Sequence, residues 1–267
     1  MKKLVGLPLC GLLLASQAGA VVLVSDNFSG LTSGQTLQTR TPDGTNFINN
    51  VNSNGWSTNS IVFSGNGSGG LAVNNFASRN VLIDLGAGYF TTNPGVYTLS
   101  VTMTTPTGQT GTSWAGIGYT PINTLDQSFN GLNSAPWLLH RNTGNVQVFG
   151  GPDATNGTSA IATTTGAAHT FVLRLDTSTP QWTVQATIDS VAVDLNGASA
   201  GTTFTYGTNP TAIRYIGIAT AFNNDSSSIQ TLDNFLFEGP VPIPEPAGVS
   251  LAAAAGGMFL LRRRRVG

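Results

Sequence analysis

The chain has 267 residues, of which 9% are charged and 40% are hydrophobic, and glycine, threonine and asparagine together make up about a third of it. These three residue types are poor helix formers, which argues against a helical protein. The hydrophobic share argues against a charged, disordered tail. A solvated all-β domain is the class of protein that fits.

Basic residues are concentrated at the two ends of the chain. Residues 21–246 contain five arginines and no lysine, against all twelve acidic residues, a net charge of −7. A nucleic-acid-binding protein needs clustered positive charge to displace counterions, so we expect no nucleic-acid partner. The single cysteine, Cys10, lies in the first hydrophobic run. A chain without that run has no disulfide and no cysteine-ligated zinc.

Residues 1–20 have the three parts of a secretory signal peptide. Two lysines follow the first residue, Leu4 to Ala15 form an apolar stretch too short to span a bilayer, and residues 18–20 read Ala-Gly-Ala, a small-x-small cleavage site. We expect signal peptidase to cleave before Val21, and an uncleaved anchor is the alternative.

The last 28 residues, 240–267, fall into three segments. A proline-rich linker (240–246) precedes an uncharged stretch (247–261) and an arginine-rich tail (262–267). Fifteen helical residues span about 22 Å against about 30 Å of hydrocarbon, so the expected transmembrane helix is short. Basic clusters stay cytoplasmic, so residues 21–246 face away from the cytoplasm in this interpretation. The linker contains Pro244, Glu245 and Pro246, and the orienting cluster is Arg262, Arg263, Arg264 and Arg265.

This order of Pro-Glu-Pro, short Ala/Gly/Leu-rich helix and terminal arginines resembles the PEP-CTERM sorting signal, found on exported proteins of Gram-negative bacteria that make exopolysaccharide. The resemblance covers about residues 241–267 and departs at Ala247-Gly248, where a serine or threonine is often seen. It implies recognition by a membrane-embedded exosortase that cleaves near the motif, and then passage to the cell surface or extracellular matrix. A plain tail anchor that is never cut is the alternative.

Residues 21–239 alternate between short β-type runs and turn clusters such as Asn93-Pro94-Gly95. In Tyr97–Thr104 every second residue is apolar and the others are threonine or serine, which indicates an antiparallel strand with one buried face. Ten or more such runs predict a sandwich of two antiparallel sheets. Further strands are expected at 81–85, 114–119, 137–140, 146–149, 170–175, 182–188, 191–195, 213–221 and 231–237, with 171–175 and 182–188 as a hairpin.

The order of these runs resembles the laminin-G-like or concanavalin-A-like jelly rolls. Asp26-Asn27-Phe28 opens the domain, and Asp233-Asn234-Phe235 lies in its last expected strand. The segments 169–176 and 182–189 look like the consecutive central strands of that family. The resemblance covers most of residues 24–239, and it implies that the first and last strands lie side by side.

A glycoside hydrolase is a remote alternative for such a fold. Jelly-roll glucanases typically carry Glu-x-Asp-x-Glu on one strand, whereas this chain has only Glu238, at the exit of the domain, and Glu245, in the tail. Serine hydrolysis needs a base, and only His140 and His169 are available, without a Gly-x-Ser-x-Gly elbow. We therefore expect a protein that is not an enzyme.

Calcium is the metal that the fold resemblance suggests, because concanavalin-like folds often hold one through Asp and Asn oxygens. The candidate ligands are Asp26, Asp233 and Asp225. A hard cation needs six to eight oxygens, and the sequence does not place the others.

Carbohydrate binding is the specific activity we expect, because sugars dock on exposed aromatic faces flanked by amide and carboxylate groups. Trp56, Trp114 and Trp137 are the candidates, and core packing is the alternative for each; Trp182 lies on an inward stripe. The negative charge favours a neutral glycan, with exopolysaccharide as a partner. The rival interpretation is a purely structural or adhesive coat or biofilm protein without a specific ligand.

Overall fold

The computed structural model describes residues 20–37, 40–45, 55–57, 62–74, 78–109, 111, 113–123, 135–149, 162–194, 201–221 and 229–240. Residues 1–19 of the expected signal peptide, the tail from residue 241 and Asp225 lie outside these ranges. Within these ranges, no helix has both the length and the apolar character needed to span a bilayer.

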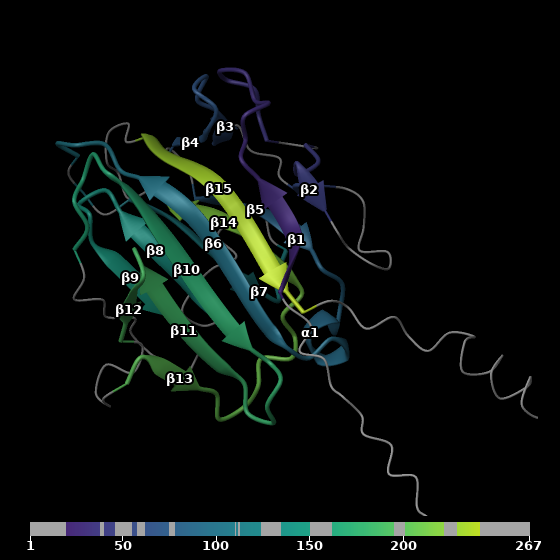
Figure 1. Ribbon diagram of the computed structural model, residues 1–267. Coiled ribbons are helices and arrows are strands. Elements are labelled where there is room, and N and C mark those ends of the chain that lie inside the picture. The colour runs from purple at the N-terminus through teal and green to yellow at the C-terminus, as the bar shows by residue number, and fades with distance from the viewer. Residues whose placement is uncertain are drawn as a thin grey trace, which may run out of the picture.

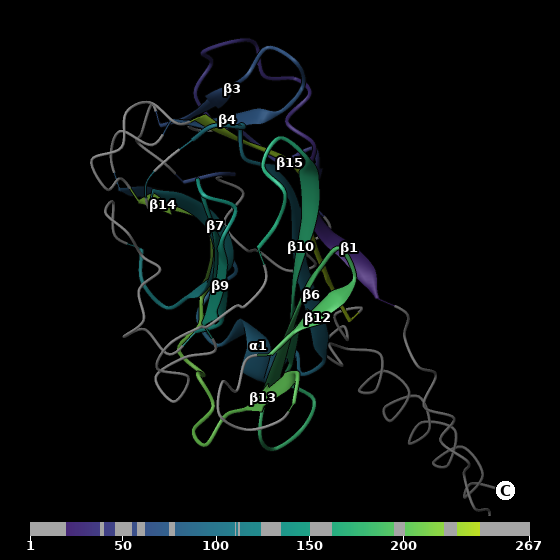
Figure 2. The same cartoon turned by 90° about the vertical axis from the view of Figure 1, so that its left-hand side faces the viewer.

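Two antiparallel sheets stack face to face and enclose the core (Figures 1 and 2). In the ten-stranded sheet the order is β12-β11-β10-β6-β15-β1-β2, with β13 beside β11, and β4 between β15 and β3. Its strands are β1 (Val21–Asp26), β2 (Gly44–Thr45), β3 (Phe63–Gly65), β4 (Leu71–Asn74), β6 (Val96–Thr104), β10 (Ala168–Asp176), β11 (Thr183–Ile188), β12 (Val191–Val193), β13 (Thr203–Thr205) and β15 (Ile229–Gly239).

The five-stranded sheet has the order β5-β14-β7-β8-β9. Its strands are β5 (Arg79–Asp84), β7 (Trp114–Thr120), β8 (Trp137–Arg141), β9 (Val146–Phe149) and β14 (Tyr215–Ala221). One short helix, α1 (Tyr89–Thr92), accompanies the strands in the described residues. The all-β, two-sheet class expected from composition and periodicity is confirmed.

The last strand occupies the middle of the larger sheet. β15 pairs antiparallel with β6 on one side and with β1 on the other. The register with β1 places Val21 opposite Gly239 and Asp26 opposite Phe235. The first and last strands therefore lie side by side, as the jelly-roll resemblance implies.

The period-two pattern of β6 divides its residues between core and outer face. Tyr97, Leu99, Val101 and Met103 are buried, and the intervening residues are partly exposed. Burying an apolar side chain contributes about 1.5–3 kcal/mol, so this alternation fixes which face points inward. Trp182 is buried in the core as expected.

The expected hairpin is formed by β10 and β11, with Phe171 opposite Ile188 and Asp176 opposite Thr183. The following turn places Asp189 and Ser190 in the left-handed region, at φ 49° and 68°. Both residues tolerate that conformation better than bulky or branched ones, and Asp is a common turn former. The turn leads directly into β12.

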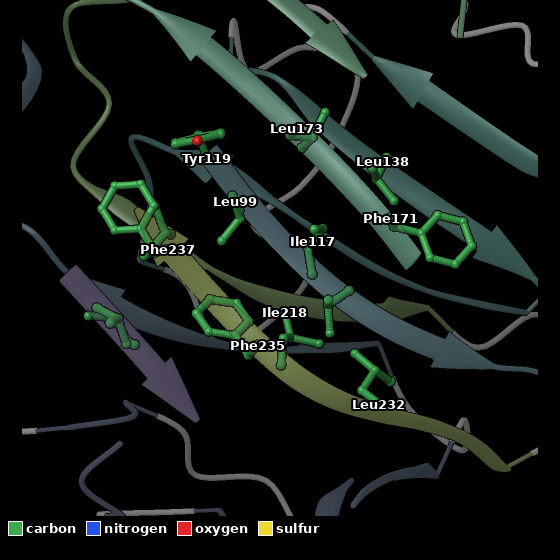
Figure 3. Packing of buried hydrophobic residues seen from close by; sticks show 14 of the residues in the cluster. Leu99, Ile117, Tyr119, Leu138, Phe171, Leu173, Ile218, Leu232, Phe235 and Phe237 are labelled. Atoms are coloured by element: carbon green, nitrogen blue, oxygen red, sulfur yellow. The ribbon is translucent and has the colours of Figure 1, made fainter. Parts of the chain in front are cut away.

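The core between the sheets is built from apolar side chains of both (Figure 3). Leu99, Phe171 and Phe237 come from the larger sheet, and Ile117 and Leu138 come from the smaller one. Phe90 of α1 closes one end of this core, packing edge-on against Tyr97 at a centroid distance of 4.8 Å. The core thus holds the two sheets in fixed relation to each other.

Leu99→Ala is expected to lower the free energy of unfolding by about 3 kcal/mol, because it removes a buried side chain from the middle of β6 and leaves a cavity. Thr98→Ala, one residue earlier on the outer face, is expected to cost less than about 1 kcal/mol. Urea denaturation of the two variants compares these values. Equal losses would contradict the assignment of the two faces.

Candidate functional site

The five-stranded sheet is apolar on both of its faces. In β7, Ala115, Ile117 and Tyr119 point into the core between the sheets, while Trp114 belongs to a second, separate apolar cluster. The outward face of a sheet is ordinarily polar, as it is in β6 of the larger sheet. The outward face of the smaller sheet departs from this pattern, because its apolar side chains form a second buried cluster.

The second cluster lies across all five strands of this outward face. Gly217 of β14, Gly118 of β7, Trp137 of β8 and Phe149 of β9 follow one another in register. A Cβ on Gly118 would lie 2.3 Å from the Cβ of Trp137, so glycine at this position makes room for the indole. The buried members are Leu82, Trp114, Trp137, Leu139, Tyr215, Ala219 and Ala221, with Phe149 packed against them.

Aromatic rings gather at the β8–β9 end of the cluster. Trp137 and Phe149 stack with centroids 4.1 Å apart and planes within 9°, and Trp114 lies 5.4 Å from Trp137. Trp114 and Trp137 are each only 4% exposed, whereas Phe149 is partly exposed. Phe149 therefore carries this ring system to the surface at the edge strand.

Two polar side chains flank these rings on the same face. Arg141 of β8 donates from Nε and Nη2 to Oε1 of Gln147 in β9, at 3.1 and 2.5 Å. Partial burial lowers the pKa of Arg141 from its ordinary value, which still leaves the guanidinium charged at neutral pH. We call Trp137, Phe149, Arg141 and Gln147 the β8–β9 platform.

The three tryptophans predicted as ligand contacts separate into two places. Trp114 and Trp137 lie together on the outward face. Trp56 is 1% exposed in the core, where its ring contacts Phe235 at 4.8 Å and its Nε1 donates to Asp26 Oδ2 at 2.8 Å. Trp56 is thus a core residue and not a surface platform. Its indole N–H is satisfied in the core because the Asp26 carboxylate accepts from it.

Asp26 is enclosed by hydrogen-bond donors. Its Oδ1 accepts from the Phe28 N–H and Arg40 Nη2, at 2.9 and 3.0 Å. Its Oδ2 accepts from Arg40 Nε at 3.2 Å and from Trp56 Nε1. A cation would have to displace the arginine that balances this carboxylate, so the donor set around Asp26 does not fit calcium.

A second predicted calcium ligand, Asp233, has a backbone partner of its own. Asp233 lies two residues from the partner of Asp26 along β15, and its Oδ1 accepts from the Asn234 N–H at 2.7 Å. Asp225 is outside the described residues. Nowhere in the described ranges do three or more histidine, cysteine, aspartate or glutamate side chains gather as metal ligands.

Among the described residues, the hydroxyls that contact the histidines are not placed to act as nucleophiles. Thr105 Oγ1 lies 3.0 Å from His140 Nδ1, but Thr105 is fully buried. His140 Nε2 lies 2.7 Å from Thr163 Oγ1, but that hydroxyl donates to the Gly144 carbonyl at 2.9 Å, so its proton is not available to the imidazole. His169 Nδ1 contacts Asp189 at 2.6 Å and is partly exposed at the start of β10, as expected for a strand-end histidine.

Neither a family model nor a curated protein sequence matches the chain. The fold is similar to an endo-1,3-β-glucanase from Streptomyces sioyaensis (TM-score 0.51, 14% identity, 85% of this chain and 99% of that chain). It is also similar to a carbohydrate esterase from the Shiga toxin-encoding bacteriophage phi24B (0.50, 14%, 84% and 100%). Peanut lectin matches with a TM-score of 0.47 at 14% identity, over 83% and 98%. The likeness to the glucanase and the esterase shows the fold alone, a two-sheet jelly-roll sandwich.

Sequence reasoning did not find Phe149, Gln147 or Arg141. The signal that could have found them is the near-continuous apolar run in β7, β8 and β14, which is typical of strands buried on both faces. Such runs predict a second apolar face. The side chains at its open edge are then the candidates for contact with a ligand.

Asp26→Asn is expected to lower the free energy of unfolding by about 3 kcal/mol, because it removes the fully buried charge that pairs with Arg40 and leaves that arginine with the exposed Asp43 alone. Asp43→Asn removes a carboxylate that also bonds Arg40 but is 41% exposed, and it is expected to cost less than about 1 kcal/mol. Chemical denaturation measures both. A calcium-dependent rise in Tm that Asp26→Asn abolishes would contradict this structural role.

Proposed function

We propose that this chain is an exported surface or extracellular-matrix protein that binds a neutral glycan, without cleaving it, at the β8–β9 platform. The observation that carries the proposal is the combination of stacked rings with an amide and a guanidinium at one sheet edge. Sugar rings pack their C–H faces on aromatic rings, and their hydroxyls bond to amide and guanidinium groups.

Charge and fold support a neutral glycan. The net charge of −7 over residues 21–246 repels acidic polysaccharides. The glucanase and the esterase with the same fold are, by their names, proteins that act on carbohydrates. The alternative is a structural or adhesive coat protein, in which the apolar face serves only to hold the molecule together.

Binding without hydrolysis is supported by the small number of carboxylates in the described strands of the five-stranded sheet. Glycosidases ordinarily use two carboxyl groups that flank the scissile bond. Among the described residues of the five-stranded sheet, Asp84 is the sole carboxylate. Arg214 engages both of its oxygens, at 2.8 and 2.6 Å. Within the described strands of this sheet, the geometry therefore offers no pair of carboxylates to the platform.

Phe149→Ala is expected to weaken binding of a neutral glycan about tenfold, equivalent to about 1.4 kcal/mol, because it removes the ring that reaches the surface. Val191→Ala, which changes an exposed apolar residue on the other sheet, is the matched control and should bind as the unaltered protein does. A glycan array with neutral polymers selects the ligand, and calorimetry measures the affinities. Absence of binding on that array, or equal affinities of both variants, would reject the platform.

The proposed route to the surface depends on the two ends of the sequence. Signal peptidase removes residues 1–20, and an exosortase recognises Pro244, Glu245 and Pro246 while the arginines 262–265 hold the tail on the cytoplasmic side. The order of these segments in the sequence supports the route. Exopolysaccharide is the partner expected outside the cell.

Intact mass of the native protein from membranes and from culture medium tests this route. We expect a secreted species that begins at Val21 and ends near Pro246. A membrane-bound species that keeps Arg265, with nothing in the medium, would leave a plain tail-anchored envelope protein. Recovery of the same mass after substitution of Pro244 and Pro246 by alanine would show that the motif is not read.

A further inference from the structure

Residues 162–166, which we call the strap, join the two sheets at one end of the sandwich. On the side of the smaller sheet, Thr163 donates to the Gly144 carbonyl from both its N–H and its Oγ1, each at 2.9 Å. On the side of the larger sheet, the Gly166 N–H donates to the carbonyl of Thr105, just after β6, at 2.7 Å. The strap therefore ties the β8–β9 turn to the end of β6.

Two histidines form hydrogen bonds with consecutive residues of the strap. His140 of β8 bonds to Thr163 Oγ1 through Nε2 at 2.7 Å, and His169 of β10 bonds to the Thr164 carbonyl through Nε2 at 3.0 Å. The ring centroids are 6.4 Å apart, with planes at 81°. One histidine comes from each sheet, so the strap is held where the two sheets meet.

The partners of His169 require its charged form. Nδ1 faces the Asp189 carboxylate at 2.6 Å and Nε2 faces the Thr164 carbonyl, and both partners accept. Only an imidazolium donates from both nitrogens. Burial alone lowers the pKa of His169, but the bonds to Asp189 and Thr164 outweigh it and the pKa is raised. Neutral His169 would keep only one of the two bonds.

The partners of His140 require its neutral form. The Thr163 hydroxyl already donates to Gly144, so it accepts from Nε2–H, and Nδ1 accepts from the Thr105 hydroxyl at 3.0 Å. The side chain is fully buried against Phe171, at a centroid distance of 5.1 Å. Burial, with the nearby positive charge of His169, lowers the pKa of His140 to about 4.

We propose that the strap is a proton-controlled clamp between the two sheets, closed when His169 carries a proton and His140 does not. Within the described part of the chain, the other ionisable group that contacts the pair is Asp189, from the turn after β11. The remaining contacts, Thr105, Thr163 and Phe171, are uncharged. The proposal goes beyond glycan binding and does not depend on it.

The directions of the pKa shifts of His169 and His140 define the pH range in which the clamp is closed. The raised pKa of His169 gives a contribution that is complete below about 6.5 and is lost as pH rises through the folded-state value. The lowered pKa of His140 weakens the closed state as pH falls from 6.5 to about 4, because the opened state takes up the proton first. The lowered pKa of Asp189 adds a loss at still more acid pH. Closure is therefore strongest near pH 6.5.

Amide hydrogen exchange of the full-length protein, corrected for the intrinsic pH dependence of exchange, tests the clamp. The Thr163 and Gly166 amides should be most protected near pH 6.5. Protection should fall on the order of 50-fold at pH 4.5, and it should also fall as pH rises to 8.5. The Leu99 amide in the centre of β6 is the internal reference and should not follow this profile. Equal protection of the strap from pH 4.5 to 8.5 would overturn the proposal.

Two matched variants test the loss of strap protection that is expected above pH 6.5. Asp189→Asn removes the charged partner of His169 and should reduce the loss of strap protection between pH 6.5 and 8.5. Asp176→Asn changes a carboxylate that bonds Ser178 and lies outside the clamp, and it should leave the profile unaltered. Identical profiles for the two variants would overturn the proposal.

Nuclear magnetic resonance of the imidazole ring protons gives a second reading that needs no substitution. His169 should titrate above its ordinary range, and His140 should stay neutral from pH 8 down to about pH 5. Titration of His140 near 6.5 would overturn the proposal, whatever the exchange data show.

Discussion

The pairing of β15 with both β6 and β1 is the contact on which the rest of the sandwich depends. β15 is the last strand in sequence, yet it lies in the middle of the larger sheet and carries Phe235 and Phe237 into the core (Figure 3). It also supports β4 at its other end. Ladders between residues more than 200 positions apart are costly to close, so the sheet is complete only after the whole domain is available.

The strands that sequence alone predicts best are those with one wet face. β6 and β11 alternate strictly, and this pattern fixes both the strand and its inward residues. β7 and β14 are buried on both faces, so the sequence signal is a near-continuous apolar run, which does not say which sheet face carries a site. The platform depends on register: Trp137 meets Phe149 only because the β8–β9 hairpin places them opposite each other.

Buried polar residues are the part of the structure that local patterns do not predict. Asp26 reads as a metal ligand in the sequence, because carboxylates are the usual ligands of calcium. Its role as the buried partner of Arg40 and Trp56 depends on segments 14 and 30 residues away. His140 is similar, since its neutral state follows from two threonine hydroxyls brought by different loops. Each of these groups is tolerated because its polar atoms are satisfied.

The same register that joins the first and last strands places the two ends of the domain together. Val21 faces Gly239, and Pro244 follows only five residues later, within about 18 Å of extended chain. On the proposed sorting route, both processing steps therefore act at one corner of the larger sheet. The β8–β9 platform faces outward from the smaller sheet, and both views place β9 far from β1 (Figures 1 and 2). In the proposed function, a membrane at the chain ends and a glycan at the platform would thus approach different sides of the domain, so tethering and binding would not compete for the same surface.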